Sequence, residues 1–194
     1  MPAKNRDLHG NVPDDAPVAL VLIDVINDLE FDGGDLLLEQ ALPMAERLAE
    51  LKRRAVAAGV PVIYANDNFG RWRSAQSAQL DHCLQDGVRG EPVVRLLRPD
   101  VDDYYVVKPK HSAFFGTTLD VLLDYMGCRT LVLAGLTGDR CVLFTANDAF
   151  MRDFHLVIPR DCVASIDPRE NEYALRLMQR VLEVNVLPSE EIGF

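Results

Sequence analysis

The sequence has few cysteines and few histidines, and this scarcity excludes several classes of protein. Its 194 residues contain four residues of each type. The cysteines are widely spaced and form no C-x-x-C pair, so neither a disulfide framework nor a zinc ribbon is indicated. No G-x-G-x-x-G motif follows the first apolar run, and a dinucleotide-binding domain is therefore not indicated either.

Long apolar runs and clusters of basic residues are also missing. No run approaches the roughly 20 apolar residues that cross a bilayer, and the first residues lack the apolar core of a secretion signal. The formal net charge is −10, and no group of Lys and Arg with interleaved aromatic residues offers a track for phosphates. We therefore expect a cytoplasmic protein that acts on a small molecule, with no nucleic-acid partner and no membrane partner.

The composition is that of one globular domain. With 48% hydrophobic and 26% charged residues, the chain can bury a sizeable core without disulfides or metal. We expect a single domain over residues 1–194. Its first part, residues 1–16, is expected to be an irregular N-terminal arm, because prolines and polar residues are frequent there.

Short apolar runs alternate with helical patterns along the chain. The runs lack strict alternation, as expected of strands covered on both faces, and the order predicts a three-layer α/β/α domain with a doubly wound, mainly parallel six-stranded sheet of Rossmann-like type. The expected strands are Val18–Ile23, Val60–Ala65, Tyr104–Val107, Thr130–Ala134, His155–Ile158 and Val184–Leu187, and the expected helices are Leu42–Ala58, Thr117–Met126, Val142–Met151 and Glu170–Glu183. The stretch Asn68–Arg98 is the least regular, and could serve as a lid over the substrate or as an oligomer contact.

One cysteine stands apart from the other three. Cys141 follows an apolar run and a turn with two glycines, Gly135 and Gly138, at the point where a helix is predicted to begin. Helix-start N–H groups favour a thiolate and can hold a developing oxyanion, so Cys141 is a candidate nucleophile. An unpaired cysteine is more often a small buried hydrophobic residue, and that interpretation suits Cys128 and Cys162.

Two further predicted strands end in ionisable residues. Asp24 follows the first strand, and Lys108 follows the third. The carboxyl ends of parallel strands meet at one edge of a sheet, which would bring both residues near Cys141. A carboxylate there more often caps a helix and a lysine more often faces solvent, but together with a cysteine they could serve as base and cation for a cysteine hydrolase.

Three segments resemble the signature blocks of the isochorismatase-like cysteine hydrolases in content, order and spacing. They are Leu22–Asp24, Lys108–Thr117 and Gly135–Val142. The resemblance runs from about Val18 to Ile166. It implies a catalytic triad of Asp24, Lys108 and Cys141, in which Asp24 takes the thiol proton and Cys141 forms an acyl-enzyme. It also implies a cis peptide bond between Leu136 and Thr137, which would direct the Thr137 N–H to the oxyanion hole beside the Cys141 N–H.

The first block departs from the family pattern, because Ile26 replaces an amide and Leu29 replaces an aromatic residue. We expect Ile26 to make the pocket floor more apolar. An Asp-x-His metal motif of the nicotinamidases is also missing after the second predicted strand, so we expect no catalytic metal and no cofactor. The pocket could be lined by Asn68, Phe69, Trp72 and Phe114, although a structural turn explains the first three equally well and a core position explains Phe114.

The complete triad favours a C–N hydrolase acting on a small amide, carbamoyl or ureido compound. Two alternatives stay open: an isochorismatase-type vinyl ether hydrolase, which need not use a cysteine nucleophile, and a catalytically silent module that keeps the fold for oligomerisation. The family resemblance further implies a homodimer or higher oligomer such as a tetramer.

Overall fold

The computed structural model describes residues 15–68 and 76–194. Nearly all of the predicted N-terminal arm, together with Phe69 and Trp72, lies outside the described residues. The strands are β1 (Val18–Ile23), β2 (Val62–Asp67), β3 (Tyr104–Lys108), β4 (Thr130–Leu136), β5 (His155–Pro159), β6 (Val163–Ala164) and β7 (Asn185–Leu187). The α-helices are α1 (Gly34–Ala57), α2 (Gln76–Gln85), α3 (Glu91–Leu96), α4 (Leu119–Met126), α5 (Leu143–Phe150) and α6 (Pro168–Val181).

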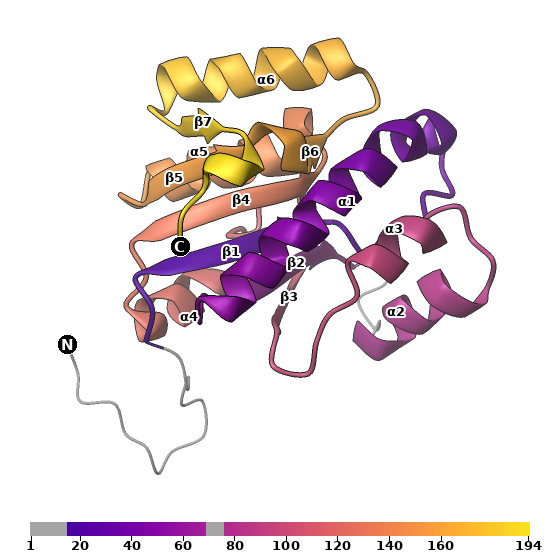
Figure 1. Cartoon of the computed structure of the whole chain (residues 1–194), viewed down its shortest axis with the longest axis horizontal. Coiled ribbons are helices and arrows are strands. Elements are labelled where there is room, and N and C mark those ends of the chain that lie inside the picture. Colours follow the sequence, from indigo (N-terminus) through magenta and orange to yellow (C-terminus); the bar gives the residue numbers. More distant parts are fainter. Residues whose placement is uncertain (1–14, 69–75) are drawn as a thin grey trace.

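The strands form one parallel sheet between two layers of helices (Figure 1). Its order is β3-β2-β1-β4-β5-β7, and β6 pairs with β4 outside this path. The expected doubly wound fold is therefore present. The sheet has seven strands where the sequence predicted six, because the two-residue β6 is too short to leave an apolar run of its own.

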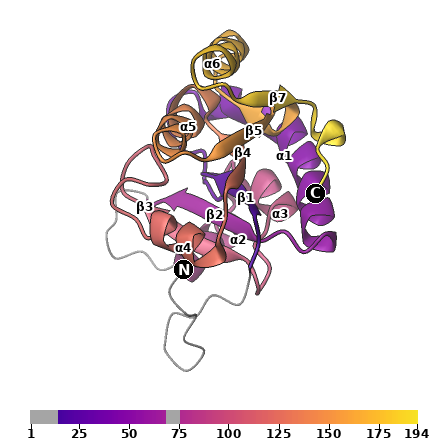
Figure 2. The same cartoon turned by 90° about the vertical axis from the view of Figure 1, so that its left-hand side faces the viewer.

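Each face of the sheet supports its own apolar core. Leu20, Leu22 and Tyr64 pack with α1, while Val21, Ile23 and other alternate strand residues pack with α4, α5 and α6. Figure 2 shows α1 on the side of the sheet opposite to α4 and α5. Burial of both faces explains why the strand runs are continuously apolar. No helix in the described part of the chain is long and apolar enough to cross a membrane.

Two of the segments that differ from the sequence prediction are helix α1 and the stretch before β3. Helix α1 begins at Gly34, eight residues before the predicted start, and continues through Pro43 because residues on both sides of the proline, Leu37, Ala41 and Met44, are buried against the sheet. The stretch predicted as irregular contains α2 and α3. These helices are short and bury few apolar side chains, and such a pattern is weak in a sequence.

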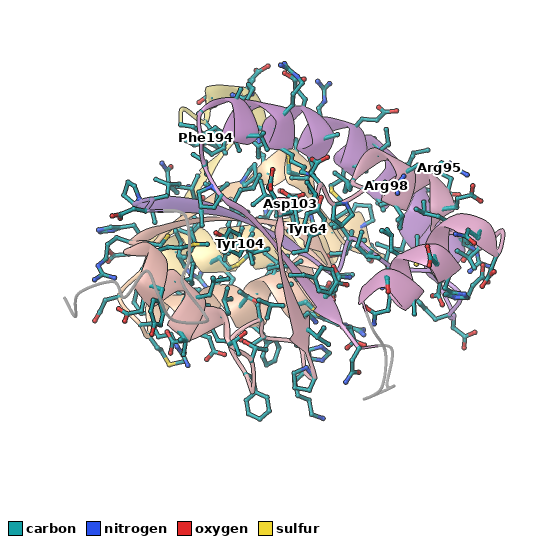
Figure 3. All side chains as sticks on the ribbon, turned by 90° about the horizontal axis from the view of Figure 1, so that it is seen from below. Tyr64, Arg95, Arg98, Asp103, Tyr104 and Phe194 are labelled. Atoms are coloured by element: carbon teal, nitrogen blue, oxygen red, sulfur yellow. The ribbon has the colours of Figure 1, made fainter. Side chains whose placement is uncertain are left out.

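A cluster of ionic groups, in which the Lys52 and Asp103 side chains are buried and the Asp100 side chain is exposed, fixes α1 to the start of β3. Lys52 Nζ lies 2.7 Å from Asp103 Oδ2 and 2.8 Å from Asp100 Oδ2, and it lies 5.3 Å from the centre of the Tyr64 ring. Figure 3 shows Tyr64 and Asp103 close together beneath α1. Asp103 precedes β3, so this cluster lies toward the amino edge of the sheet and leaves the carboxyl edge free for a site.

Candidate active site

The order of the strands places a crevice at the carboxyl end of β1. Strands β2 and β3 extend the sheet on one side of β1, and β4 begins the other side. Such a reversal of winding direction is where doubly wound folds bind ligands. Strands β1 and β4 approach closely here: Gly135 has φ +113°, and a Cβ atom on it would lie 2.2 Å from the carbonyl oxygen of Ile23. Glycine is required at this position for both reasons.

Asp24, Lys108 and Cys141 meet at this crevice. Lys108 Nζ lies 2.6 Å from Asp24 Oδ2 and 3.5 Å from Cys141 Sγ. Lys108 extends from β3 past the end of β2 to reach both partners. The backbone N–H of Asp67, the last residue of β2, donates to Asp24 Oδ1 at 2.7 Å. The three side chains come from distant parts of the sequence and form one contiguous polar group.

Burial separates the roles that these groups can take. Asp24 is 6% exposed and Lys108 is 1% exposed, whereas Cys141 is only partly buried. The cavity above them has a volume of about 510 Å³ and is lined by both Asp24 and Cys141, a size suited to a small-molecule substrate. Cys141 therefore faces the cavity, and Lys108 supports the group from behind.

Burial and the nearby carboxylate favour a neutral thiol at Cys141 in the resting protein. Burial, followed by the nearby Asp24 carboxylate, raises the pKa of Cys141 to about 12, and Lys108 opposes this shift. Burial also raises the pKa of Asp24 above its ordinary value against the effect of Lys108. The expectation that a helix start would leave Cys141 as a thiolate is corrected by this environment, because the thiol is desolvated and lies beside a carboxylate.

Cys141 lies in a π-helical turn, Gly138–Val142, that leads directly into α5. The N–H of Val142 donates to the carbonyl oxygen of Thr137 at 3.1 Å and closes this turn. The peptide bond between Leu136 and Thr137 is cis. The π turn makes the helical segment start at Gly138, four residues earlier than the sequence predicted. Thr137 and Cys141 both line the cavity.

Three of the predicted pocket residues lie elsewhere. Ile26 is 1% exposed and belongs to the core under α1, and Phe114 is 4% exposed and packs against Phe154. Asn68 is buried as well. None of these residues lines the cavity. These three side chains are buried in the interior and therefore do not form the cavity wall. Much of the wall is formed by residues that follow β1, β4 and β6, namely Asn27, Asp28, Phe31, Asp139, Arg140, Ile166 and Asp167.

Sequence reasoning missed His111 and Thr145. His111 lines the cavity and its Nδ1 lies 3.6 Å from Cys141 Sγ. Thr145 is fully buried in α5 and donates to the carbonyl oxygen of Cys141 at 2.7 Å. His111 belongs to the block that carries Lys108, so its place in that block was a usable signal. Thr145 gave none, since a threonine within a predicted helix is common.

No group of three or more His, Cys, Asp and Glu side chains within residues 15–68 and 76–194 is arranged to hold a metal ion. Asp67 lies at the end of β2, where the sequence analysis considered a metal motif, and its backbone N–H instead supports Asp24. The expectation of a protein without a catalytic metal and without a cofactor stays a prediction.

Comparison with known proteins places the chain in a family. The model of the isochorismatase domain matches residues 18–190. The uncharacterized isochorismatase family protein YaaI of Bacillus subtilis is 37% identical over 177 residues, which cover 91% of this chain and 97% of that protein. The maleamate amidohydrolase of Pseudomonas putida is 28% identical, over 78% of this chain and 75% of its own length.

A solved structure shows the same fold over nearly the whole chain. The crystal structure of N-carbamoylsarcosine amidase from Thermoplasma acidophilum superposes with a TM-score of 0.71 at 31% identity, covering 92% of this chain and 100% of the other. The family model and a 37% identical relative both extend over most of the sequence. The chain therefore belongs to the isochorismatase family and is a hydrolase of that family.

Proposed function

We propose that this protein is a cysteine hydrolase that cleaves a C–N bond in a small amide, carbamoyl or ureido compound through an acyl-enzyme on Cys141. The observation that carries this proposal is the contact of the Cys141 sulfur with a buried Lys108–Asp24 pair at the wall of an open cavity. Two relatives named as an amidohydrolase and an amidase support the same type of bond.

Attack on the substrate begins with a proton transfer inside the cluster. Cys141 is a neutral thiol, and Asp24 is the adjacent base whose raised pKa suits it to take the S–H proton. Lys108 keeps its proton, because Asp24 and Cys141 together hold its pKa above the ordinary value against the opposing effect of burial. The resulting thiolate lies beside the Lys108 ammonium and attacks the carbonyl carbon.

Collapse of the tetrahedral intermediate returns the proton. The N–H groups of Thr137 and Cys141 are assigned to the oxyanion, since both residues line the cavity at the π turn. Asp24 gives its proton to the leaving nitrogen, the C–N bond breaks, and ammonia or an amine departs. A water molecule then gives a proton to Asp24 and attacks the thioester, the C–S bond breaks with release of a carboxylic acid, and Asp24 returns its proton to the sulfur to restore the Cys141 thiol.

The experiment combines turnover with trapping of the intermediate. A panel of small amides, carbamoyl compounds and ureas is screened by detection of ammonia, and mass spectrometry of the quenched reaction reports an acyl group on the Cys141 peptide. Cys141→Ala and Cys141→Ser should abolish release of ammonia. Cys128→Ala is the matched control, because Cys128 is buried just before β4, at the opposite edge of the sheet. Release of ammonia by Cys141→Ala would overturn the acyl-enzyme.

The remaining expectations about partners stay predictions from the sequence. They are a homo-oligomer, a cytoplasmic location, and action on a small molecule without nucleic-acid or membrane partners.

A further inference from the structure

Within the described residues, His111 is a side chain near the Cys141 sulfur to which the proposed reaction gives no role. Its Nδ1 lies 3.6 Å from Cys141 Sγ, and its ring packs against Phe144 with the ring centres 5.4 Å apart. An exposed histidine usually turns its nitrogens to water. This one is exposed, yet Phe144 flanks its ring and one nitrogen points to the sulfur.

The partners of Lys108 leave the sulfur in need of a second donor. A lysine ammonium has three N–H donors, and Lys108 Nζ contacts Asp24 Oδ2, the carbonyl oxygen of Lys110 and Cys141 Sγ. One donor therefore reaches the sulfur from this residue. A thiolate formed beside the Asp24 carboxylate is destabilised by like charge, and each additional N–H donor to the sulfur offsets this.

We propose that His111 is a further catalytic residue, which donates a hydrogen bond from Nδ1–H to the Cys141 thiolate from the solvent side of the cavity. This inference rests on the proposed function, since it assigns a second stabilising group to the same nucleophile. This role requires the imidazole tautomer that carries its proton on Nδ1, and no proton leaves the imidazole in the step. The S–H proton goes to Asp24, which lies on the buried side of the sulfur.

The protein holds His111 and Cys141 in place through one shared residue. The Thr145 hydroxyl donates to the Cys141 carbonyl oxygen at 2.7 Å and accepts from the Ala113 N–H at 3.0 Å. Ser112, beside His111, donates to Asp148 on α5. The segment that carries His111 is therefore fixed to the helix that follows Cys141, and such fixed donors are effective in stabilising developing charge.

Other charged groups share the cavity with His111. Asp24 follows β1, and Lys108, which ends β3, lies behind it. The remaining titratable or charged residues that line the cavity are Asp28, Asp67, Asp139, Arg140, Cys141, Asp167 and Glu170. Of the side chains in the described part of the chain, Lys108 and His111 place a nitrogen within hydrogen-bond distance of the Cys141 sulfur. A test must therefore distinguish the effect of these two groups on the sulfur from the electrostatic effect of the other charged residues in the cavity.

The test uses alkylation of Cys141 by iodoacetamide, which reports the thiolate without requiring turnover. Three variants are compared with the wild-type protein. His111→Phe keeps an aromatic ring and removes the donor, and His111→Asn places an amide N–H near the position of Nδ1–H. His155→Phe is the matched control, because His155 is also exposed and begins β5 at the other edge of the sheet.

Loss of a donor to a charged, partly exposed sulfur should lower the thiolate fraction about tenfold. A thiol with a higher pKa gives a more nucleophilic thiolate, and this partly offsets the smaller thiolate fraction. The alkylation rate of Cys141 in His111→Phe should therefore fall about threefold at mildly alkaline pH. His111→Asn should stay within about twofold of the wild type. The kcat of His111→Phe on an amide substrate should fall about tenfold with a smaller change in KM.

Two results would overturn the role of His111. The first is an unchanged rate of alkylation in His111→Phe, and the second is an equal loss in His111→Phe and His111→Asn, which would assign the effect to the ring and not to the donor. Failure of the proposed function has a different signature. In that case Cys141→Ala would still release ammonia, while the alkylation series would keep its meaning.

Discussion

Removal of the Lys108 ammonium is the change that most directly tests the energetics of the site. Lys108→Met keeps the length and apolar stem of the side chain but leaves the Asp24 carboxylate buried, with the Asp67 N–H still donating to it. Removing one member of a buried ion pair costs about 3 to 5 kcal/mol. In a domain of this size, that lowers Tm by about 6 to 20 °C.

The dependence of this loss on pH has a definite sign. The pKa of Asp24 is raised by burial above its ordinary value of 3.8, and removal of Lys108 raises it further. As pH rises above 3.8 the unfolded chain releases the Asp24 proton before the folded protein does, so stability falls until the folded-state pKa is passed. The deficit of Lys108→Met against the wild type should therefore be largest at neutral pH and shrink as the pH falls toward 3.8.

A double variant separates stability from catalysis. Asp24→Asn combined with Lys108→Met removes both charges, and the Asn side-chain oxygen can still accept from the Asp67 N–H. Urea unfolding at neutral pH should show that the double variant recovers most of the loss of the single variant. Both proteins should lack amidase activity. Wild-type stability in Lys108→Met, or an equal deficit in the two variants, would refute the view of a buried and mutually dependent ion pair.

Two further predictions concern the fold and its response to pH. Gly135→Ala should lower the free energy of unfolding by more than about 3 kcal/mol or prevent folding, because the new Cβ would lie 2.2 Å from the Ile23 carbonyl oxygen at φ +113°. Gly59→Ala, at φ +72° with open space around it, should lower the free energy of unfolding by about 1 kcal/mol. Equal losses of thermal stability in Gly135→Ala and Gly59→Ala would contradict the steric argument. The urea midpoint should also fall between pH 9 and 11, because burial raises the pKa of buried thiols from 9.0 to about 11 or 12, and the unfolded chain ionises them first. Cys162→Ala should show a shallower fall, and a flat midpoint in the wild type would count against the argument.

The sequence and the structure agree where local chemistry determines the result. The strand runs gave the parallel sheet because both faces are buried, and β1 has the predicted bounds, Val18–Ile23. Prediction was wrong where local signals were weak or misleading. The helix predicted to begin at Leu42 begins at Gly34, because its first turns are buried against the sheet, and the short helix α3 buries too little apolar surface to stand out in the sequence.

The candidate site divides in the same way. Residue type and position after a strand singled out Asp24, Lys108 and Cys141, since a charged side chain at the end of an apolar run is costly unless it has a partner. The pocket residues depended on side-chain directions that a sequence does not contain. Ile26 and Phe114 point into apolar cores, and His111 reaches the cavity.

By itself, the sequence determined the α/β class, the carboxyl edge as the place of the site, and the three residue types that could act there. These follow from apolar periodicity and from the chemistry of single side chains. The tertiary structure decided the strand order, which lets Lys108 cross β2 to reach Asp24 and Cys141. It also decided the ionisation of the cluster. Burial and the charges of Asp24 and Lys108 set the pKa of Cys141, and these arise only when distant segments of the chain come together.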